Sequence, residues 1–512
     1  MRVLRAGRLT LLLCVPACLL AVLLVLAATG SPAAASPAPD PPAAVGAAAS
    51  GLRFTREERA ADAILAAQRR DFLERHAASL DRLFTGPIAA LRRELAHEKL
   101  YQTLQDMPKG GMLHIHATAT GRASWIVDRA LSEPRCFIYW GPPSDRYARG
   151  QLAFFPGQTV PAGWLRVATV ARFVPHLRAR LLALYTLGPE DAASTDIWKE
   201  FEAAFQRVDA FVSYRPVFVD YYAHAFRVLA RDGVQFVELR TSVDPLLDEH
   251  GRSITDEAVL DLYRSVLARV RATYPSFDLR LIVCTWRGAS LQDAAAQMER
   301  TRRLMRSAPD LIAGFDVVGE EDGGNSNAFY APVLSSLPQV SLFLHGGESL
   351  SPADTNVRDA WLLGSTRISH GLNIGLFPGL EAELRQSGVM LEVCPLSNKA
   401  LRYVPDPRLH PAKGLLRRGL RIVLGSDDPA IFGTVGLTDD FWTVYVAWRL
   451  DLHTLKLLAL DSILRSSLPA DRRERQRDLF ERGWQRFIRG VIEEDREAAA
   501  GSALPQALPD AA

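Results

Sequence analysis

The sequence predicts an α/β fold, a (β/α)8 TIM barrel with N-terminal helices before it and an insertion subdomain after its first strand. Eight short apolar segments recur along the chain, most intervals between them have a helical pattern, and polar residues follow several of the segments. Apolar strands that alternate with helices are typical of a parallel sheet, and eight repeats fit a closed barrel. The eight segments are residues 111–116, 234–240, 279–284, 312–317, 340–345, 366–369, 389–394 and 421–424.

The overall composition is that of a globular protein with a sizeable core. Of the 512 residues, 48% are hydrophobic and 23% are charged, and the formal net charge is only +2. The sequence has no Lys/Arg-rich run with interleaved aromatic residues, so we expect no nucleic acid as a partner. It also has no CxxC motif, and we therefore expect any metal ion to bind histidines and carboxylates.

The N-terminus has the pattern of an export signal. Three arginines within residues 2–8 precede an apolar stretch over residues 9–28, and small residues follow at 32–36. This order predicts a signal peptide over residues 1–30 and an exported protein, either periplasmic or extracellular. The apolar stretch is also long enough to span a bilayer, so we expect membrane contact only if the signal is retained.

The remaining chain divides into a linker, a helical region, the barrel and a tail. Residues 31–50 are almost all Ala, Pro, Ser and Gly, which predicts a disordered linker. We expect helices over residues 51–106 and the barrel over residues 107–490. More than a hundred residues separate the first two apolar segments, too many for one connection, which predicts an insertion subdomain at about 135–195. Residues 491–512 are expected to form a flexible tail.

Residues that can bind a metal ion stand at the ends of several predicted strands. His114 and His116 are two positions apart, so both side chains point to the same face of the first strand. His345 ends the fifth strand, His370 follows the sixth, and Asp427 follows the eighth. Because catalytic groups of barrel enzymes lie at this edge, we predict a metal centre with His114, His116, His345 and Asp427 as ligands. The alternative is a coincidence of buried polar groups satisfied by hydrogen bonds.

Three imidazoles and one carboxylate suit a zinc-like ion and leave one position for water. Such an ion lowers the pKa of its water towards about 7, which makes hydroxide available at neutral pH. Glu348 lies three residues past His345, close enough to exchange a proton with a substrate beside the metal. Its alternative role is to orient His345.

The sequence also resembles a known enzyme family from about residue 60 to about residue 490. Its motifs are similar to those of the adenosine deaminase family of metal-dependent amidohydrolases, and especially of the secreted growth-factor-like branch that includes adenosine deaminase 2. The motifs occur in the same order as in that family. They are Met107 to His116, Trp198 to Glu202, Pro216 to Tyr222, Gly314 to Asp322, His345 to Glu348, Arg367 to Gly371, Glu392 to Asn398 and Ser426 to Gly433.

The resemblance implies a hydrolase with one Zn2+ ion per subunit that converts adenosine or 2′-deoxyadenosine to inosine and ammonia. In this mechanism a metal-activated water attacks C6 of the purine, and His370 accepts its proton. Glu348 in its neutral form donates a proton to N1, and burial favours that form. Asp428 hydrogen-bonds N7, and the backbone N–H of Gly319 binds N3. The resemblance also implies a homodimer formed through the N-terminal helices.

Sugar recognition departs from the pattern of the family. The family has a carboxylate that contacts the ribose just after the first two histidines, where this chain has Ala117 and Thr118. Trp286 stands where the secreted branch has a histidine near the sugar, and Trp198 is expected either to contact the sugar or to be a core aromatic residue. The departures keep two alternatives open, a modified adenosine or other aminopurine as substrate, and an exported binding or signalling protein on the same scaffold.

Overall fold

The computed structural model describes residues 54–144, 146–188, 191, 194–243 and 246–502. All of these lie in the second of the two units into which the chain divides, residues 43–512. The signal peptide and the linker predicted from the sequence lie outside the described residues, and export stays a prediction. Within the described ranges, no helix is both long enough and apolar enough to cross a membrane.

Eight parallel strands in the described part of the chain form the predicted (β/α)8 barrel. They make two four-stranded sheets, ordered β1-β5-β6-β7 and β11-β10-β9-β8. Isolated parallel bridges join the sheets at both edges, between Ile115 and Asp427 and between Phe315 and Leu342, which closes the barrel. The strands are β1 (Gly110–His116), β5 (Val234–Thr241), β6 (Asp278–Trp286), β7 (Ile312–Val318), β8 (His345–Gly346), β9 (Arg367–His370), β10 (Met390–Val393) and β11 (Arg421–Leu424).

The fifth strand is shorter than the sequence predicts. Residues 340–345 form an apolar segment, but only the last of them belongs to β8. The backbone of Ser341 and Phe343 pairs with Phe315 on β7 through one isolated bridge instead of a regular ladder. The bridge still keeps this segment in the barrel wall, and His345 therefore lies at the carboxyl edge of the barrel.

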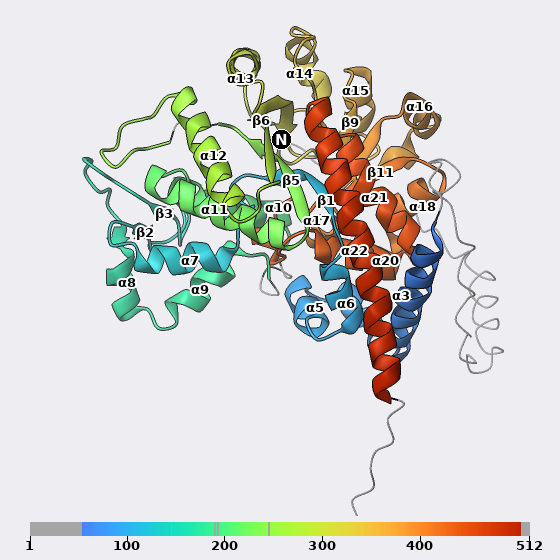
Figure 1. Cartoon of the computed structure of the whole chain (residues 1–512). Helices are drawn as coiled ribbons and strands as arrows, with labels where there is room; N and C mark the ends of the chain where they lie inside the picture. Colours follow the sequence, from blue (N-terminus) through green and yellow to red (C-terminus); the bar gives the residue numbers. More distant parts are fainter. Residues whose placement is uncertain (1–53, 145, 189–190, 192–193, 244–245, 503–512) are drawn as a thin grey trace, which may run out of the picture. The chain divides into compact units, whose positions relative to one another are not determined.

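One main helix precedes or follows each strand on the outside of the barrel (Figure 1). Thr255, Ser290 and Ser326 begin three of these helices, because each side chain accepts a backbone hydrogen bond from the first turn. The main helices are α11 (Arg215–Arg231), α12 (Asp256–Arg271), α13 (Leu291–Ser307), α14 (Asn327–Leu334), α15 (Asn356–Leu362), α16 (Leu380–Ser387), α18 (Pro411–Arg417) and α21 (Leu452–Leu464). Shorter helices are α17 (Pro395–Ala400), α19 (Pro429–Phe432) and α20 (Leu437–Ala447).

The N-terminal region forms four helices, and the first of them packs beside the C-terminal helix. These are α3 (Arg56–Arg75), α4 (Leu80–Thr85), α5 (Ile88–Leu95) and α6 (Lys99–Gln105). In Figure 1 the long helix α22 (Ala470–Ser502) lies beside α3 and α21. At this contact the buried Glu58 accepts hydrogen bonds from Lys456 Nζ at 3.0 Å and Trp484 Nε1 at 2.9 Å. The predicted homodimer contact through the N-terminal helices stays a prediction.

The last helix extends into the segment predicted to be a flexible tail. The sequence prediction ends the ordered chain near residue 490, whereas α22 continues to Ser502. Phe487, Ile488 and Val491 are all buried, so the apolar face of this helix continues past the predicted boundary. The prediction is based on the Ala/Pro-rich composition of the last residues, and the flexibility of residues 491–512 stays a prediction.

The long connection between β1 and β5 contains its own small sheet and several helices. Strands β2 (Phe137–Tyr139), β3 (Leu152–Ala153) and β4 (Trp164–Arg166) pair in antiparallel fashion in the order β3-β2-β4. Helices α7 (Ala123–Ser132), α8 (Val167–Phe173) and α9 (Leu177–Tyr185) lie next to this sheet in Figure 1. Helix α10 (Ile197–Val212) follows and packs beside α11, which brings its side chains to the edge of the barrel.

Candidate active site

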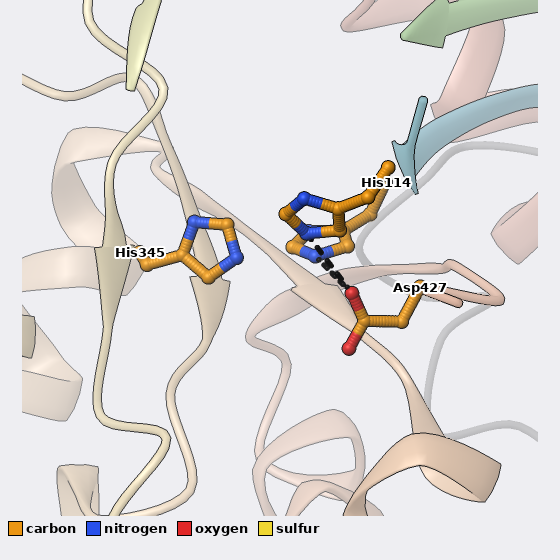
Figure 2. Close-up of side chains that lie close together, drawn as sticks. His114, His345 and Asp427 are labelled. Atoms are coloured by element: carbon orange, nitrogen blue, oxygen red, sulfur yellow. Dashed lines mark hydrogen bonds and ion pairs between the residues drawn. The ribbon is translucent and has the colours of Figure 1, made fainter. Parts of the chain in front are cut away.

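Four side chains meet at the carboxyl edge of the barrel. His114 and His116 come from β1, His345 from β8, and Asp427 follows β11. Each residue offers one ligand atom, a nitrogen or an oxygen, and these four atoms all lie within 4.8 Å of one another. Asp427 Oδ1 is 3.1 Å from Nε2 of both His114 and His116. Figure 2 shows the rings of His114 and His345 facing Asp427, and this set of three imidazoles and a carboxylate fits a zinc ion.

A second group of potential ligands overlaps the first. His370, Cys394 and Asp427 also place one ligand atom each within 4.8 Å of one another. Burial raises the pKa of the Cys394 thiol well above its usual value, and a thiol that keeps its proton is a poor metal ligand. The first group, with four donors, is therefore the better metal-site candidate.

Two buried carboxylates orient the candidate ligands. Nδ1 of His114 lies 3.1 Å from Glu392 Oε2, and Nδ1 of His345 lies 2.8 Å from Asp316 Oδ2. Asp316 Oδ1 also accepts the backbone N–H of His345 at 2.9 Å. Because each carboxylate accepts a proton donated by Nδ1, the Nε2 lone pair of each ring is left for a metal ion.

Arg240 on β5 connects these two carboxylates across the barrel. Its Nε donates to Asp316 Oδ2 at 2.7 Å, and its Nη2 donates to Glu392 Oε2 at 2.6 Å. Burial alone would raise the pKa of Glu392, but the guanidinium groups of Arg240 and Arg367 hold it well below its usual value. The sequence prediction of the site missed Asp316, Glu392 and Arg240. Each of the three is a charged residue within or at the end of an otherwise apolar predicted strand, and this pattern could have identified them.

Three further predicted residues surround the metal-site candidate. Glu348, His370 and Asp428 are each at most 3% exposed. Burial raises the pKa of Glu348 and of Asp428 well above their usual values, and the nearby Asp427 raises them further. Burial also lowers the pKa of His370 well below its usual value. Burial therefore favours the uncharged forms of the two carboxyl groups and of the imidazole.

These residues also have buried atoms that lack a protein partner. His370 Nδ1 lies 3.5 Å from Glu348 Oε1, but His370 Nε2 has no hydrogen-bond partner among the described residues. Asp428 Oδ1 likewise has none within the described part of the chain. Such atoms are costly to bury alone, so they point to water or a bound molecule at this place.

The backbone is strained at two of these positions. Six non-glycine residues of the described chain have a positive φ, and His370 at 67° and Asp427 at 58° are among them. A residue in this region costs of order 1–3 kcal/mol and persists only where the surrounding structure holds it. Strain at two predicted site residues therefore supports a functional role for this edge of the barrel.

A cavity of about 550 Å3 opens beside the metal-site candidate. Its lining includes His116, His345, Glu348, Asp427 and Asp428, so the predicted ligands and polar groups reach it. A volume of this size is within the range of small-molecule sites. The cavity therefore has room for a small molecule against the metal-site candidate.

The remaining predicted substrate residues, Gly319 and Trp198, also line this cavity. Gly319 has a φ of 111°, and a Cβ atom there would lie 2.9 Å from the Trp286 ring. Trp286 itself is 59% exposed and lines the cavity. The Trp198 indole N–H donates to the Tyr403 hydroxyl at 2.8 Å, so its ring rather than its N–H is presented to a ligand.

Comparisons with known proteins agree with this geometry. The family model described as adenosine deaminase matches residues 181–482. Adenosine deaminase 2 from Sus scrofa is 31% identical over 414 residues, which cover 76% of this chain and 80% of the relative. The structure of adenine deaminase from Arthrobacter aurescens has a TM-score of 0.54 at 20% identity, and covers 73% of this chain and 98% of that chain. An amidohydrolase from Burkholderia ambifaria solved with bound zinc has a TM-score of 0.54 at 16% identity. The match covers 77% of this chain and 95% of that chain. The two solved structures share the fold.

Proposed function

The chain belongs to the adenosine deaminase family, in the branch of adenosine deaminase 2, and from this premise we propose that it deaminates adenosine or 2′-deoxyadenosine with a bound zinc ion. It is a hydrolase that acts on a C–N bond of a purine. The proposed products are inosine and ammonia. The observation that carries the proposal is a buried glutamate, whose neutral form is favoured by burial, beside a group of three histidines and an aspartate.

The metal-site candidate supports the choice of zinc. His114, His116, His345 and Asp427 would hold the ion, because their ligand atoms already converge and two of the rings are oriented by carboxylates. A bound zinc ion lowers the pKa of a water molecule and so makes hydroxide available at neutral pH. The donor set of imidazoles and carboxylate is one that zinc prefers.

The residues around the metal-site candidate can donate and accept the protons that the reaction requires. Neutral Glu348 can donate its proton to N1 of the purine, which makes C6 more electrophilic. With the proton of the His370 ring on Nδ1, facing Glu348, the free Nε2 can accept a proton from the attacking water. Burial favours the protonated form of Asp428, which can donate a hydrogen bond to N7. The backbone N–H of Gly319, at the cavity wall, is proposed to bind N3.

Metal analysis combined with a deamination assay tests this proposal. We expect the purified chain to contain one zinc ion and to release ammonia from adenosine. A chelator should abolish the reaction, and added zinc should restore it, since no other described group supplies hydroxide at neutral pH. Zinc-loaded protein that releases no ammonia from any 6-aminopurine nucleoside or base would overturn the proposal and favour a binding protein on this scaffold.

The Ala117→Asp variant tests sugar recognition. Ala117 is half-buried and lines the cavity directly after His116, where a carboxylate could accept a hydrogen bond from a ribose hydroxyl. A hydrogen bond to a charged group contributes about 1.5–3 kcal/mol. We therefore expect the Michaelis constant for adenosine to fall about tenfold to a hundredfold.

The Ala117→Asn variant is the matched control, because it adds the same volume without the charge. It should lower the Michaelis constant less than Ala117→Asp does. Steady-state kinetics with adenosine measure both values. An unchanged Michaelis constant in Ala117→Asp would show that position 117 does not face the sugar.

A further inference from the structure

One part of the active-site cavity is lined by buried aliphatic and aromatic side chains. Six side chains make up this part, which we call the inner chamber: Phe218, Tyr222, Val243, Leu246, Val259 and Tyr263. They come from α11, from α12 and from the segment after β5, and none is more than 4% exposed. All six are aliphatic or aromatic, so the described walls of the inner chamber are suited to an apolar group.

The aromatic walls of the inner chamber are closely packed. The ring centroids of Phe218, Tyr222 and Tyr263 lie 4.6 to 5.5 Å apart. The hydroxyl of Tyr263 donates to Thr241 Oγ1 at 3.4 Å, so this polar atom has a protein partner. Val243 has a φ of 53°, which is rare for a β-branched residue and supports a functional role for this position.

Ala117 and Thr118 line the same cavity as the metal-site candidate and the inner chamber. The backbone N–H of Ala117 donates to the carbonyl of Arg240 on β5 at 2.9 Å. The carbonyl of Thr118 accepts a hydrogen bond of 2.5 Å from the hydroxyl of Tyr221, which precedes Tyr222 on α11. The backbone of Ala117 and Thr118 is therefore held against β5 and α11, and Ala117 adds only a methyl group to the cavity wall.

The direction of the cavity determines where a substrate would extend. The side along α10 opens to solvent, because the lining residues Glu202, Gln206 and Asp209 are exposed there. A purine with C6 at the metal-site candidate can instead place its sugar beside Ala117 and Thr118. The exocyclic 5′ carbon is the outermost part of the sugar, and it would then face the inner chamber.

We propose, on the basis of the deaminase function above, that the preferred substrate is an adenosine with a small, uncharged, apolar group at the 5′ position, such as an alkylthio group. The inner chamber would remove that group from water, which stabilises the complex. The 5′ hydroxyl of adenosine gains less, because a polar group loses hydrogen bonds with water when an apolar chamber encloses it.

A 5′ phosphate fits this cavity poorly. Glu202 and Asp209 give the same cavity two carboxylates, and their negative charge disfavours the entry of a phosphate. Arg240 also lines it, but its guanidinium group already binds Asp316 and Glu392. Among the described lining residues, no other arginine or lysine is present to neutralise a phosphate. The cavity therefore selects against nucleotides.

A substrate panel on the zinc-loaded full chain tests the proposal. The probes are adenosine, 5′-deoxy-5′-methylthioadenosine and adenosine 5′-monophosphate. We expect kcat/KM for the methylthio compound to exceed that for adenosine by about tenfold, through a lower Michaelis constant. We expect kcat/KM for the monophosphate to be roughly a hundredfold below that for adenosine.

Two variants connect the preference to the inner chamber. Val243→Asn adds a polar group, and asparagine tolerates the left-handed backbone at this position. Leu246→Phe fills the chamber. Each should lower the ratio of kcat/KM for the methylthio compound over adenosine by about tenfold. Leu247→Phe is the matched control, because Leu247 does not line the cavity, and its ratio should stay at the wild-type value.

The outcomes separate this inference from the proposed function. A methylthio compound that is no better than adenosine, or a ratio that neither chamber variant changes, would overturn the inference while adenosine deamination still stands. Faster turnover of the monophosphate than of adenosine would also overturn it. A chain that deaminates none of the three probes would instead contradict the proposed function.

Discussion

Replacing Glu348 with glutamine is expected to lower kcat by about 10²–10⁴-fold while the chain keeps its metal ion. Glutamine has almost the shape of a neutral carboxylic acid, but it cannot transfer a proton to N1 of the purine. Glu348 lies outside the four-residue metal-site candidate, so that group should be undisturbed. Single-turnover deamination of adenosine measures the loss, and metal analysis of the same sample measures the zinc content.

Glu321→Gln is the matched control for this variant. Glu321 is a second buried carboxyl, and burial with nearby Asp354 raises its pKa to about 8. Its Oε2 accepts the backbone N–H of Gly347 at 2.9 Å, a hydrogen bond that the carbonyl of glutamine preserves. Glu321→Gln should therefore keep most of the activity. If Glu348→Gln lost zinc in parallel with its activity, Glu348 would be a ligand rather than a proton donor.

The sequence was sufficient to predict the barrel and the residues that meet at its edge. The alternation of strands and helices is a local pattern, and the ends of parallel strands in a barrel lie at the same edge. His114, His345 and Asp427 could therefore be grouped although more than three hundred residues separate the first from the last. This reasoning needs only the strand ends and not the side-chain packing.

The residues that orient the ligands could not be predicted in the same way. Arg240, Asp316 and Glu392 lie within or at the end of apolar strands, and their partners come from distant strands of both sheets. The inner chamber also depends on tertiary packing, because α11, α12 and the segment after β5 each supply two of its side chains. Periodicity shows that such a residue is buried but not which residues it faces.

Replacing Arg240 with methionine is expected to lower both the stability of the chain and its affinity for zinc. The variant leaves Asp316 without its closest cation, and it leaves Glu392 with Arg367 alone. Removing one partner of a buried ion pair costs about 3–5 kcal/mol of unfolding free energy. The two carboxylates would also hold His345 and His114 less firmly, which lowers metal affinity by about 10–100-fold. Chemical denaturation and zinc competition with a chelator measure the two effects.

Arg280→Met separates these two effects. Arg280 is a buried arginine on β6, next to β5, but its guanidinium group donates to the carbonyls of Pro309 and Ile312 instead of to the carboxylates that orient the histidines. Its loss should lower the free energy of unfolding while zinc affinity stays close to the wild-type value. Equal zinc affinity in Arg240→Met and Arg280→Met, measured where both are folded, would contradict an orienting role for Arg240. A loss of zinc affinity in Arg240→Met but not in Arg280→Met would show that the guanidinium group of Arg240 orients two ligands, one from each sheet, for the same ion.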